Sequence, residues 1–156
     1  MNIFVLDTDP GTAAEYHCDK HVIKMILESA QMLCTVCNQH DRQTPYLSAH
    51  PKHPCTLWAG NSLSNWLWLK ELAKWLNNEY LWRYDKAPHK SWEVIEKLEV
   101  PPIEDIGLTQ FPLCMPDKYK SDNVVQSYRE FYRKEKARFA TWSFPAKEPR
   151  WFRRKT

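Results

Sequence analysis

The most regular pattern of apolar and polar positions lies between residues 12 and 37, where the spacing predicts a long amphipathic helix. Its apolar stripe is expected to face the interior and consists of Cys18, Val22, Met25, Ile26, Ser29 and Leu33. Thr12 and Glu15 have the spacing of a capping box, which predicts that the helix starts there. The apolar run from Ile3 to Leu6 is too short for a helix and predicts a lone strand or an extended arm.

A second helical pattern covers about residues 56 to 84 and is apolar around much of its circumference. A helix of this kind is normally surrounded by protein, so we expect it to be the central and most buried helix. Its expected apolar positions are Leu57, Leu63, Trp66, Leu67, Leu69, Leu72, Ala73, Leu76 and Tyr80.

Two shorter helices and two irregular loops complete the predicted elements. A short helix is expected over residues 91–98, and a last helix runs from an Asp122 cap to about Phe139. The inward side of that last helix is expected to carry Val124, Val125, Tyr128, Phe131 and Tyr132. Prolines within residues 38–54 and 100–116 predict irregular loops in both stretches.

Together these patterns predict a mainly α fold, a compact helical bundle forming one domain over residues 1–156. It is expected to have a short N-terminal extended arm, long proline-rich loops, and a basic aromatic tail from about residue 140. Only three glycines are present, which excludes a P-loop and a dinucleotide-binding fingerprint.

The chain shows no pattern of a membrane or secreted protein. No apolar run reaches the length of a membrane span, and the first ten residues lack the features of a signal peptide. Five cysteines, an odd number, fit reduced thiols better than a disulfide framework. We therefore expect a soluble protein of the bacterial or infected-cell cytoplasm, with no membrane partner.

Charge is distributed unevenly along the chain. Residues 1–116 contain 10 Lys/Arg and 14 Asp/Glu, whereas residues 117–156 contain 12 Lys/Arg and 5 Asp/Glu. A basic C-terminal part favours binding of a polyanion such as nucleic acid. The alternative is a solvated basic helix followed by a loose tail.

Four titratable side chains fall on one line of the first predicted helix: His17, His21, Lys24 and Glu28. Imidazoles titrate near neutral pH, so either histidine can act as a general acid or base. Lys24 can hold a phosphate or act as an amine nucleophile, and Glu28 can act as a carboxylate acid or base. We take these four as the candidate catalytic residues; the alternative is an ordinary solvated helix face.

Two patterns have the spacing of metal ligands. His17 and His21 lie four residues apart, as zinc-binding histidines on a helix do, but a cysteine replaces the glutamate that an HExxH motif needs. The pair Cys34 and Cys37 could be completed by His40, His50, His53 or Cys55. No second Cys-x-x-Cys motif exists, so we expect no bound metal and no cofactor.

Several residues are candidates for nucleic-acid binding. His53 lies in a loop stiffened by prolines, which would hold it at a fixed place next to the site. Aromatic rings can stack on unpaired bases while basic groups bind phosphates. The candidates are Lys20, His53, Arg138, Trp142, Arg150, Trp151, Arg153 and Arg154. The alternative, that Trp142 and Trp151 fasten the tail to the core, is compatible with this role.

A resemblance to a known family rests on four parts of the chain: NIFVLDTDPGTAAEYHCDKHVIKMILESAQML, HPKHPCTLW, FPLCMPDKYK, and the ending RFATW with PRWF. These parts resemble small viral and bacterial proteins labelled pyrimidine-dimer DNA glycosylase-like, and they cover most of the chain. Characterised proteins of that label are small helical glycosylase/lyases. They attack C1′ of a damaged nucleotide with an N-terminal amine, helped by a glutamate, on bent DNA with a base flipped out.

The resemblance implies specific groups in this chain. Residue 2 is Asn, which usually leaves Met1 in place, so the attacking amine would be that of Met1 or of Lys24. The helix carboxylate would be Glu15 or Glu28. Our leading hypothesis is therefore a glycosylase/lyase acting on damaged or modified pyrimidines in DNA. The alternatives are a viral nucleotide- or base-modifying enzyme, with or without a metal, and a non-catalytic DNA-binding or inhibitory module.

Overall fold

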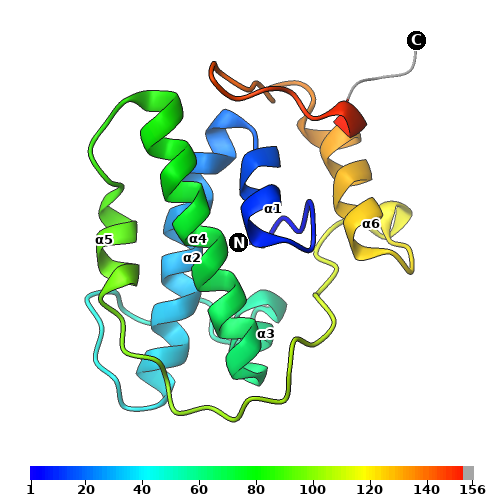
Figure 1. Ribbon diagram of the computed structural model, residues 1–156. Coiled ribbons are helices and arrows are strands. Elements are labelled where there is room, and N and C mark those ends of the chain that lie inside the picture. The colour runs from blue at the N-terminus through cyan, green and yellow to red at the C-terminus, as the bar shows by residue number, and fades with distance from the viewer. Residues whose placement is uncertain (153–156) are drawn as a thin grey trace.

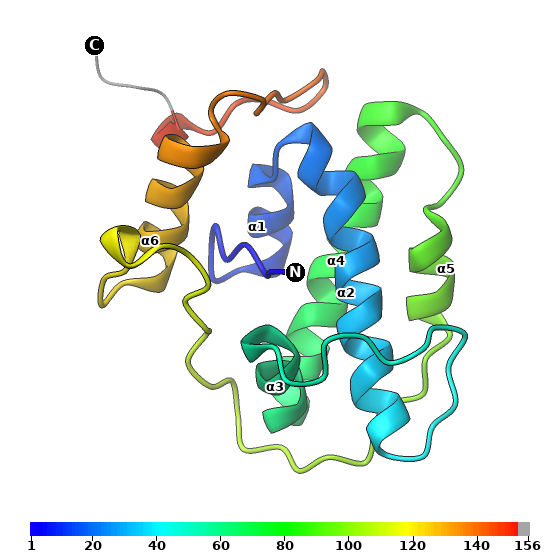
Figure 2. The same cartoon turned by 180° about the vertical axis from the view of Figure 1, so that it is seen from behind.

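The computed structural model describes residues 1–152, and within that range it contains α-helices and short helical turns but no β-strand. The α-helices are α1 (Pro10–Tyr16), α2 (Asp19–Gln39), α3 (Pro54–Asn61), α4 (Leu63–Tyr84), α5 (Lys90–Glu96) and α6 (Val124–Phe131). The turns are η1 (Asp117–Tyr119), η2 (Tyr132–Lys136) and η3 (Arg150–Phe152). α2 and α4 run antiparallel, with α1 packed on α4 and with α3 and α5 packed on α2 (Figures 1 and 2). The predicted mainly α bundle is confirmed.

The single helix predicted over residues 12–37 is in fact two helices, because the backbone is extended at His17 and Cys18. α1 begins directly after Asp9, whose carboxylate accepts the backbone N–H of Thr12, so the predicted capping box is wrong. The apolar stripe is nevertheless buried as expected, at Cys18, Val22, Met25, Ile26, Ser29 and Leu33.

A buried arginine explains why the chain can break between α1 and α2. The Arg83 guanidinium donates hydrogen bonds to the carbonyls of Glu15 and His17 at the end of α1, and it pairs with the Asp19 carboxylate. The backbone N–H of Asp19 donates to the carbonyl of Thr141 in the tail. The polar groups released by the break are therefore paired, as buried backbone groups must be.

The helix predicted over residues 56–84 is also divided, at the extended residue Ser62. Asp105, from the irregular segment after α5, accepts hydrogen bonds from the backbone N–H of Ser64 and from the hydroxyls of Ser62 and Ser64. This carboxylate from a distant segment caps α4, a role that no local spacing indicates. The short helix expected over residues 91–98 is α5.

The most buried helix is α2 rather than the second predicted helix. Fourteen of the 21 residues of α2 are buried, against nine of 22 in α4. Leu57 and Leu67, predicted as core positions, are exposed, as are Trp75 and Trp82. In the described part of the chain, no helix has both the length and the apolar character to cross a membrane.

The N-terminal residues form the predicted extended arm. Residues 3–6 are buried without pairing in a sheet, and the arm lies between α1 and α6 in both views (Figures 1 and 2). The Phe4 ring stacks on His21 at 4.4 Å between centroids and meets Tyr128 and Tyr132 edge to face. The arm therefore joins α2 to α6 through aromatic packing.

The last helix begins one residue later than predicted, because Asn123 rather than Asp122 provides the capping side chain. At Tyr132 it passes into a π-helical turn that ends at Lys136, so the α-helix stops before Phe139. Such turns are rare and are often found at functional sites. The predicted inward residues are buried at Tyr128 and Tyr132 and half-buried at Val124, Val125 and Phe131.

The tail from residue 140 packs on the helices. The Trp142 indole donates to the carbonyl of Tyr16, and Ser143 donates to the Asp19 carboxylate through both its backbone N–H and its hydroxyl. Trp151 contacts the rings of Tyr16 and Tyr132. The interpretation that the two tryptophans fasten the tail to the core is therefore confirmed.

Candidate functional site

The amine of Met1 lies against the carboxylate of Glu28. The Met1 nitrogen is 3.4 Å from Glu28 Oε1, and the same oxygen accepts the Asn2 backbone N–H at 2.9 Å. The Met1 side chain is only 4% exposed, and its sulfur accepts a hydrogen bond from the Thr56 hydroxyl. Because Met1 as a whole is half-buried, its exposed surface belongs to main-chain atoms. The end of the arm thus lies beside α2 (Figure 2), with a buried carboxylate paired to an amine.

A second amine approaches the same carboxylate. Lys24 lies one turn earlier on α2, and its Nζ is 3.8 Å from Glu28 Oε2. Its side chain is 68% exposed, so this amine is open to solvent. The structure therefore brings Lys24 and Glu28 together as predicted, and it places Glu28 between two amines.

His53 belongs to the same neighbourhood. Its Nδ1 accepts the backbone N–H of Cys55 at 3.0 Å, which caps α3 and holds the ring in place. Burial lowers the pKa of His53, and the positive charges of the Met1 amine and of His50 lower it further, while Glu28 raises it. The loop that carries His53 therefore borders the Met1–Glu28 pair.

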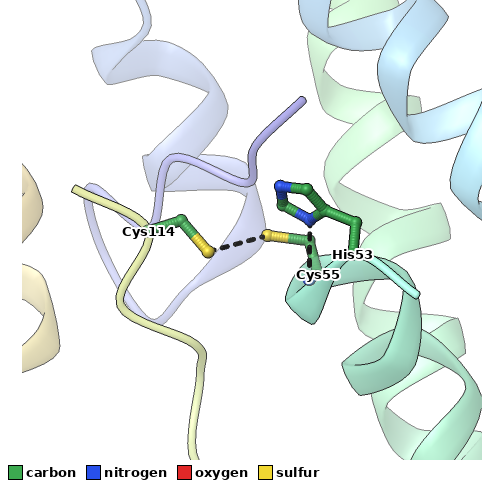
Figure 3. Close-up of side chains that lie close together, drawn as sticks. All are labelled: His53, Cys55 and Cys114. Atoms are coloured by element: carbon green, nitrogen blue, oxygen red, sulfur yellow. Dashed lines mark hydrogen bonds between the residues drawn. The ribbon is translucent and has the colours of Figure 1, made fainter. Parts of the chain in front are cut away.

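Two thiols face each other next to His53 (Figure 3). Cys55 Sγ and Cys114 Sγ are 3.6 Å apart. The hydrogen bond from Cys55 lowers the pKa of Cys114 to about 7, while this contact and burial raise the pKa of Cys55. The Asn2 carboxamide joins the thiols to the arm: Nδ2 donates to the Cys114 carbonyl at 2.9 Å, and Oδ1 accepts the Tyr128 hydroxyl at 3.2 Å.

These thiols and the imidazole are the residues best placed to hold a metal. Ligand atoms of His53, Cys55 and Cys114 all lie within 4.8 Å of one another, which no other set of three such residues achieves within residues 1–152. The predicted pair Cys34 and Cys37 is buried in the core instead, where burial raises the pKa of both thiols.

His17 and His21 do not share an exposed line with Lys24, because the break after α1 turns His17 into the core. His17 Nδ1 donates to the Ala13 carbonyl at 2.6 Å, and His21 Nδ1 lies 2.6 Å from the Tyr132 hydroxyl. Burial lowers the pKa of His17 to about 4 and that of His21 to about 3. Both imidazoles are therefore neutral at pH 7, and the predicted four-residue line is wrong as a geometric arrangement.

A basic surface lies near Lys24. Lys20 Nζ and Arg138 Cζ lie 5.2 and 5.7 Å from the centroid of the Phe139 ring, so two predicted nucleic-acid contacts are neighbours. Lys134, Lys136 and Arg138 line an open groove of about 760 Å³ at the π-helical turn. Partial burial lowers the pKa of Lys136, and the charges of Lys24 and Arg138 lower it further. Lys136 in the groove is therefore close enough to Lys24 for the two positive charges to repel each other.

The other predicted nucleic-acid contacts lie in the tail. Arg150 is exposed, whereas Trp142 and Trp151 are half-buried against the core rather than presenting free faces. Arg129 also lies over the Trp151 ring, at 5.2 Å from Cζ to the centroid. Arg153 and Arg154 lie outside the described residues.

Sequence reasoning missed the thiol pair and the groove residue Lys136. Cys55 and Cys114 are separated by 59 positions and share no motif, so their spacing carries no information about their contact. Lys136 is inconspicuous in a basic stretch, and only the fold places its ammonium over the rings of Phe4 and Phe131. The Met1 amine and Glu28 were among the alternatives that the resemblance implied, and the fold brings these two together.

Comparison with known proteins adds no relative: no protein-family model, curated protein or solved structure matches this chain.

Proposed function

We propose that this protein is a DNA glycosylase/lyase that uses the amine of Met1 as its nucleophile. The observation that supports it is the pairing of that amine with the buried Glu28 carboxylate at 3.4 Å. An amine nucleophile needs a base to take its proton, and a carboxylate in contact with it can do so. Damaged or modified pyrimidines as substrates follow from the family resemblance of the sequence.

The proposed chemistry begins with proton transfer from the Met1 ammonium to Glu28. The amine nitrogen attacks C1′ of the target nucleotide, the bond from C1′ to the base breaks, and the base departs with the bonding electrons and takes up a proton. The sugar ring opens to an imine between C1′ and the Met1 nitrogen. Glu28 passes the proton it accepted to the departing base and is then a carboxylate again. In that form it faces the positive charge of the iminium at C1′, and such preorganised charge is a large source of catalysis.

His53 is the histidine that suits proton movement in this site. It lies near the Met1 amine and Glu28, and it is half-buried rather than enclosed. His17 and His21 are instead occupied with core hydrogen bonds. The proposal therefore assigns to His53 the proton transfer that the sequence pattern suggested for His17 or His21.

The basic surface supplies the contact with DNA. Lys20, Lys134, Lys136 and Arg138 can bind backbone phosphates next to the amine, and Lys24 can hold a phosphate at the reacting nucleotide. Because phosphate contacts release counterions, binding should weaken steeply with added salt.

The test is reductive trapping with borohydride, which converts an imine into a stable covalent adduct. The full chain is mixed with labelled DNA that carries a cyclobutane pyrimidine dimer, an abasic site or only normal bases. We expect an adduct with the dimer-containing DNA, and peptide mapping should locate it on Met1. A short peptide placed ahead of Met1 turns the amine into an amide and should abolish the adduct.

Two carboxylate variants sharpen this test. Glu28→Gln should reduce adduct formation by about 100-fold, in the range expected for loss of an acid–base group. Glu15→Gln is the matched control, because Glu15 is an exposed glutamate on α1, and it should leave the yield unchanged. An adduct on Lys24 would contradict the assignment of Met1. Salt-dependent DNA binding with no adduct on any DNA would contradict the enzyme and favour a binding module.

A further inference from the structure

We propose that His53, Cys55 and Cys114 form a binding site for a soft divalent cation of the Zn²⁺ class. The inference does not rest on the amine chemistry proposed above, because it involves no step at the Met1 nitrogen; His53 is the one residue that belongs to both proposals. Figure 3 shows the three side chains converging from the start of α3 and from the segment that precedes η1.

The separation of the sulfur atoms suits one shared cation. Cys55 Sγ and Cys114 Sγ are 3.6 Å apart. Two thiolates on a tetrahedral zinc ion, each about 2.3 Å from the metal, are about 3.8 Å apart. A cation can therefore enter between these sulfurs with little movement of either chain segment.

The imidazole can supply a third bond if it gives up its present hydrogen bond. His53 Nδ1 accepts the Cys55 backbone N–H, so this nitrogen presents a lone pair rather than a proton toward Cys55. A cation can take that lone pair in place of the N–H. Two thiolates and one imidazole are ligands that zinc prefers, and they leave a fourth tetrahedral position for water.

Charge also favours a divalent ion at this place. Cys55 is buried, and two thiolates there without a counter-ion would be costly. A divalent cation balances them, and the two thiol protons pass to solvent on binding. The ion would also fasten α3 to the segment around Cys114, and through Asn2 it would hold the end of the arm.

The test uses the full chain, reduced and freed of metal with a chelator, and then titrated with Cd²⁺ or Co²⁺. Thiolate bonds to these ions give charge-transfer absorption, which reports sulfur ligation without any assay of activity. We expect one equivalent to bind with such a band, and Zn²⁺ to displace it. Absence of the band in the reduced wild-type protein would overturn the proposal.

Variants identify the ligands. Cys55→Ser and Cys114→Ser should each lose the band, while the double variant Cys34→Ala/Cys37→Ala, the matched control, should keep it. The variant His53→Asn retains a side-chain oxygen that can cap α3. It should weaken metal binding at least about tenfold, because loss of a group that merely supports a ligand already has an effect of that size. Loss of the band in the control, or its survival in Cys114→Ser, would contradict the assignment.

A measurement on the unaltered protein covers the case in which a variant fails to fold. Zn²⁺ should slow alkylation of Cys114, the half-buried thiol of the pair, in the wild-type chain. Unchanged alkylation of Cys114 at saturating Zn²⁺ would overturn the proposal. Neither readout depends on borohydride trapping, so failure of this inference and failure of the proposed function are distinguishable.

Discussion

Acid should destabilise this protein through two histidines of its core. His17 and His21 are buried and neutral in the folded chain, with pKa values lowered by burial to about 4 and about 3. In the unfolded chain both imidazoles take up a proton near their ordinary pKa of about 6.5. The unfolded state therefore binds more protons below that pH, and the free energy of unfolding falls as the pH is lowered.

The size of the effect follows from these pKa values. At pH 5 the solution is about 1.5 pH units below the ordinary histidine pKa, and each unit corresponds to about 1.4 kcal/mol. Each histidine should thus remove about 2 kcal/mol of stability between pH 7 and pH 5, and the two together about 4 kcal/mol. Carboxylates contribute little in this range, because their ordinary pKa values lie at about 4.

The perturbation that tests this reasoning is His21→Asn. Asparagine does not titrate, and its side chain can still form a hydrogen bond with the Tyr132 hydroxyl, which His21 Nδ1 approaches at 2.6 Å. Burial also lowers the pKa of His53 and His89, which add to the loss of stability in wild type and variant alike. Urea unfolding at pH 7 and pH 5 should therefore show a loss that is about 2 kcal/mol smaller in His21→Asn than in the wild-type protein. The comparison concerns the pH dependence, so any packing change common to both pH values cancels.

A control separates the core histidines from the others. His50 is exposed and has a backbone φ of 48°, a conformation that asparagine tolerates well, so His50→Asn should keep the wild-type pH dependence. If His21→Asn lost as much stability between pH 7 and pH 5 as the wild-type protein, the assignment of this acid sensitivity to His21 would be refuted.

Two further predictions concern the arginine of the α1–α2 break and the basic groove. Arg83→Met should lower the free energy of unfolding by about 3–5 kcal/mol, since it leaves the buried carboxylate of Asp19 and the half-buried carboxylate of Glu79 without their cation. Urea denaturation at pH 7 measures this, and a loss below about 1 kcal/mol would contradict it. Lys136→Ala should weaken DNA binding, measured by fluorescence anisotropy. The slope of log K against log salt concentration should become less steep by about one, because one phosphate contact is lost. Lys147→Ala, an exposed lysine of the tail, is the control, and an equal effect of both variants would argue against the groove.

The helical architecture was predictable because it depends on local patterns. The apolar stripe at residues 18–33 faces inward, the proline-rich segments are irregular, and the arm is extended, as the residues indicated. Helix ends were less predictable. The capping side chains are Asp9 and Asn123 rather than Thr12 and Asp122, since several neighbouring residues can cap equally well.

The interruptions of the helices were beyond local patterns. Arg83 and Asp105 supply hydrogen bonds from segments far along the chain. These bonds pair the backbone groups that the breaks at His17 and Ser62 leave without helical partners. A helical pattern continues through both positions, so periodicity alone predicts one helix where the fold contains two.

In the candidate site, too, local patterns were predictable and long-range contacts were not. The sequence by itself determined the helix that carries Lys24 and Glu28, because periodicity of side chains depends on neighbours a few residues apart. Only the tertiary structure decided that Met1 meets Glu28, that Cys55 meets Cys114, and that the two histidines turn into the core. Such contacts depend on how segments distant in the chain pack together, and residue spacing carries no information about that packing.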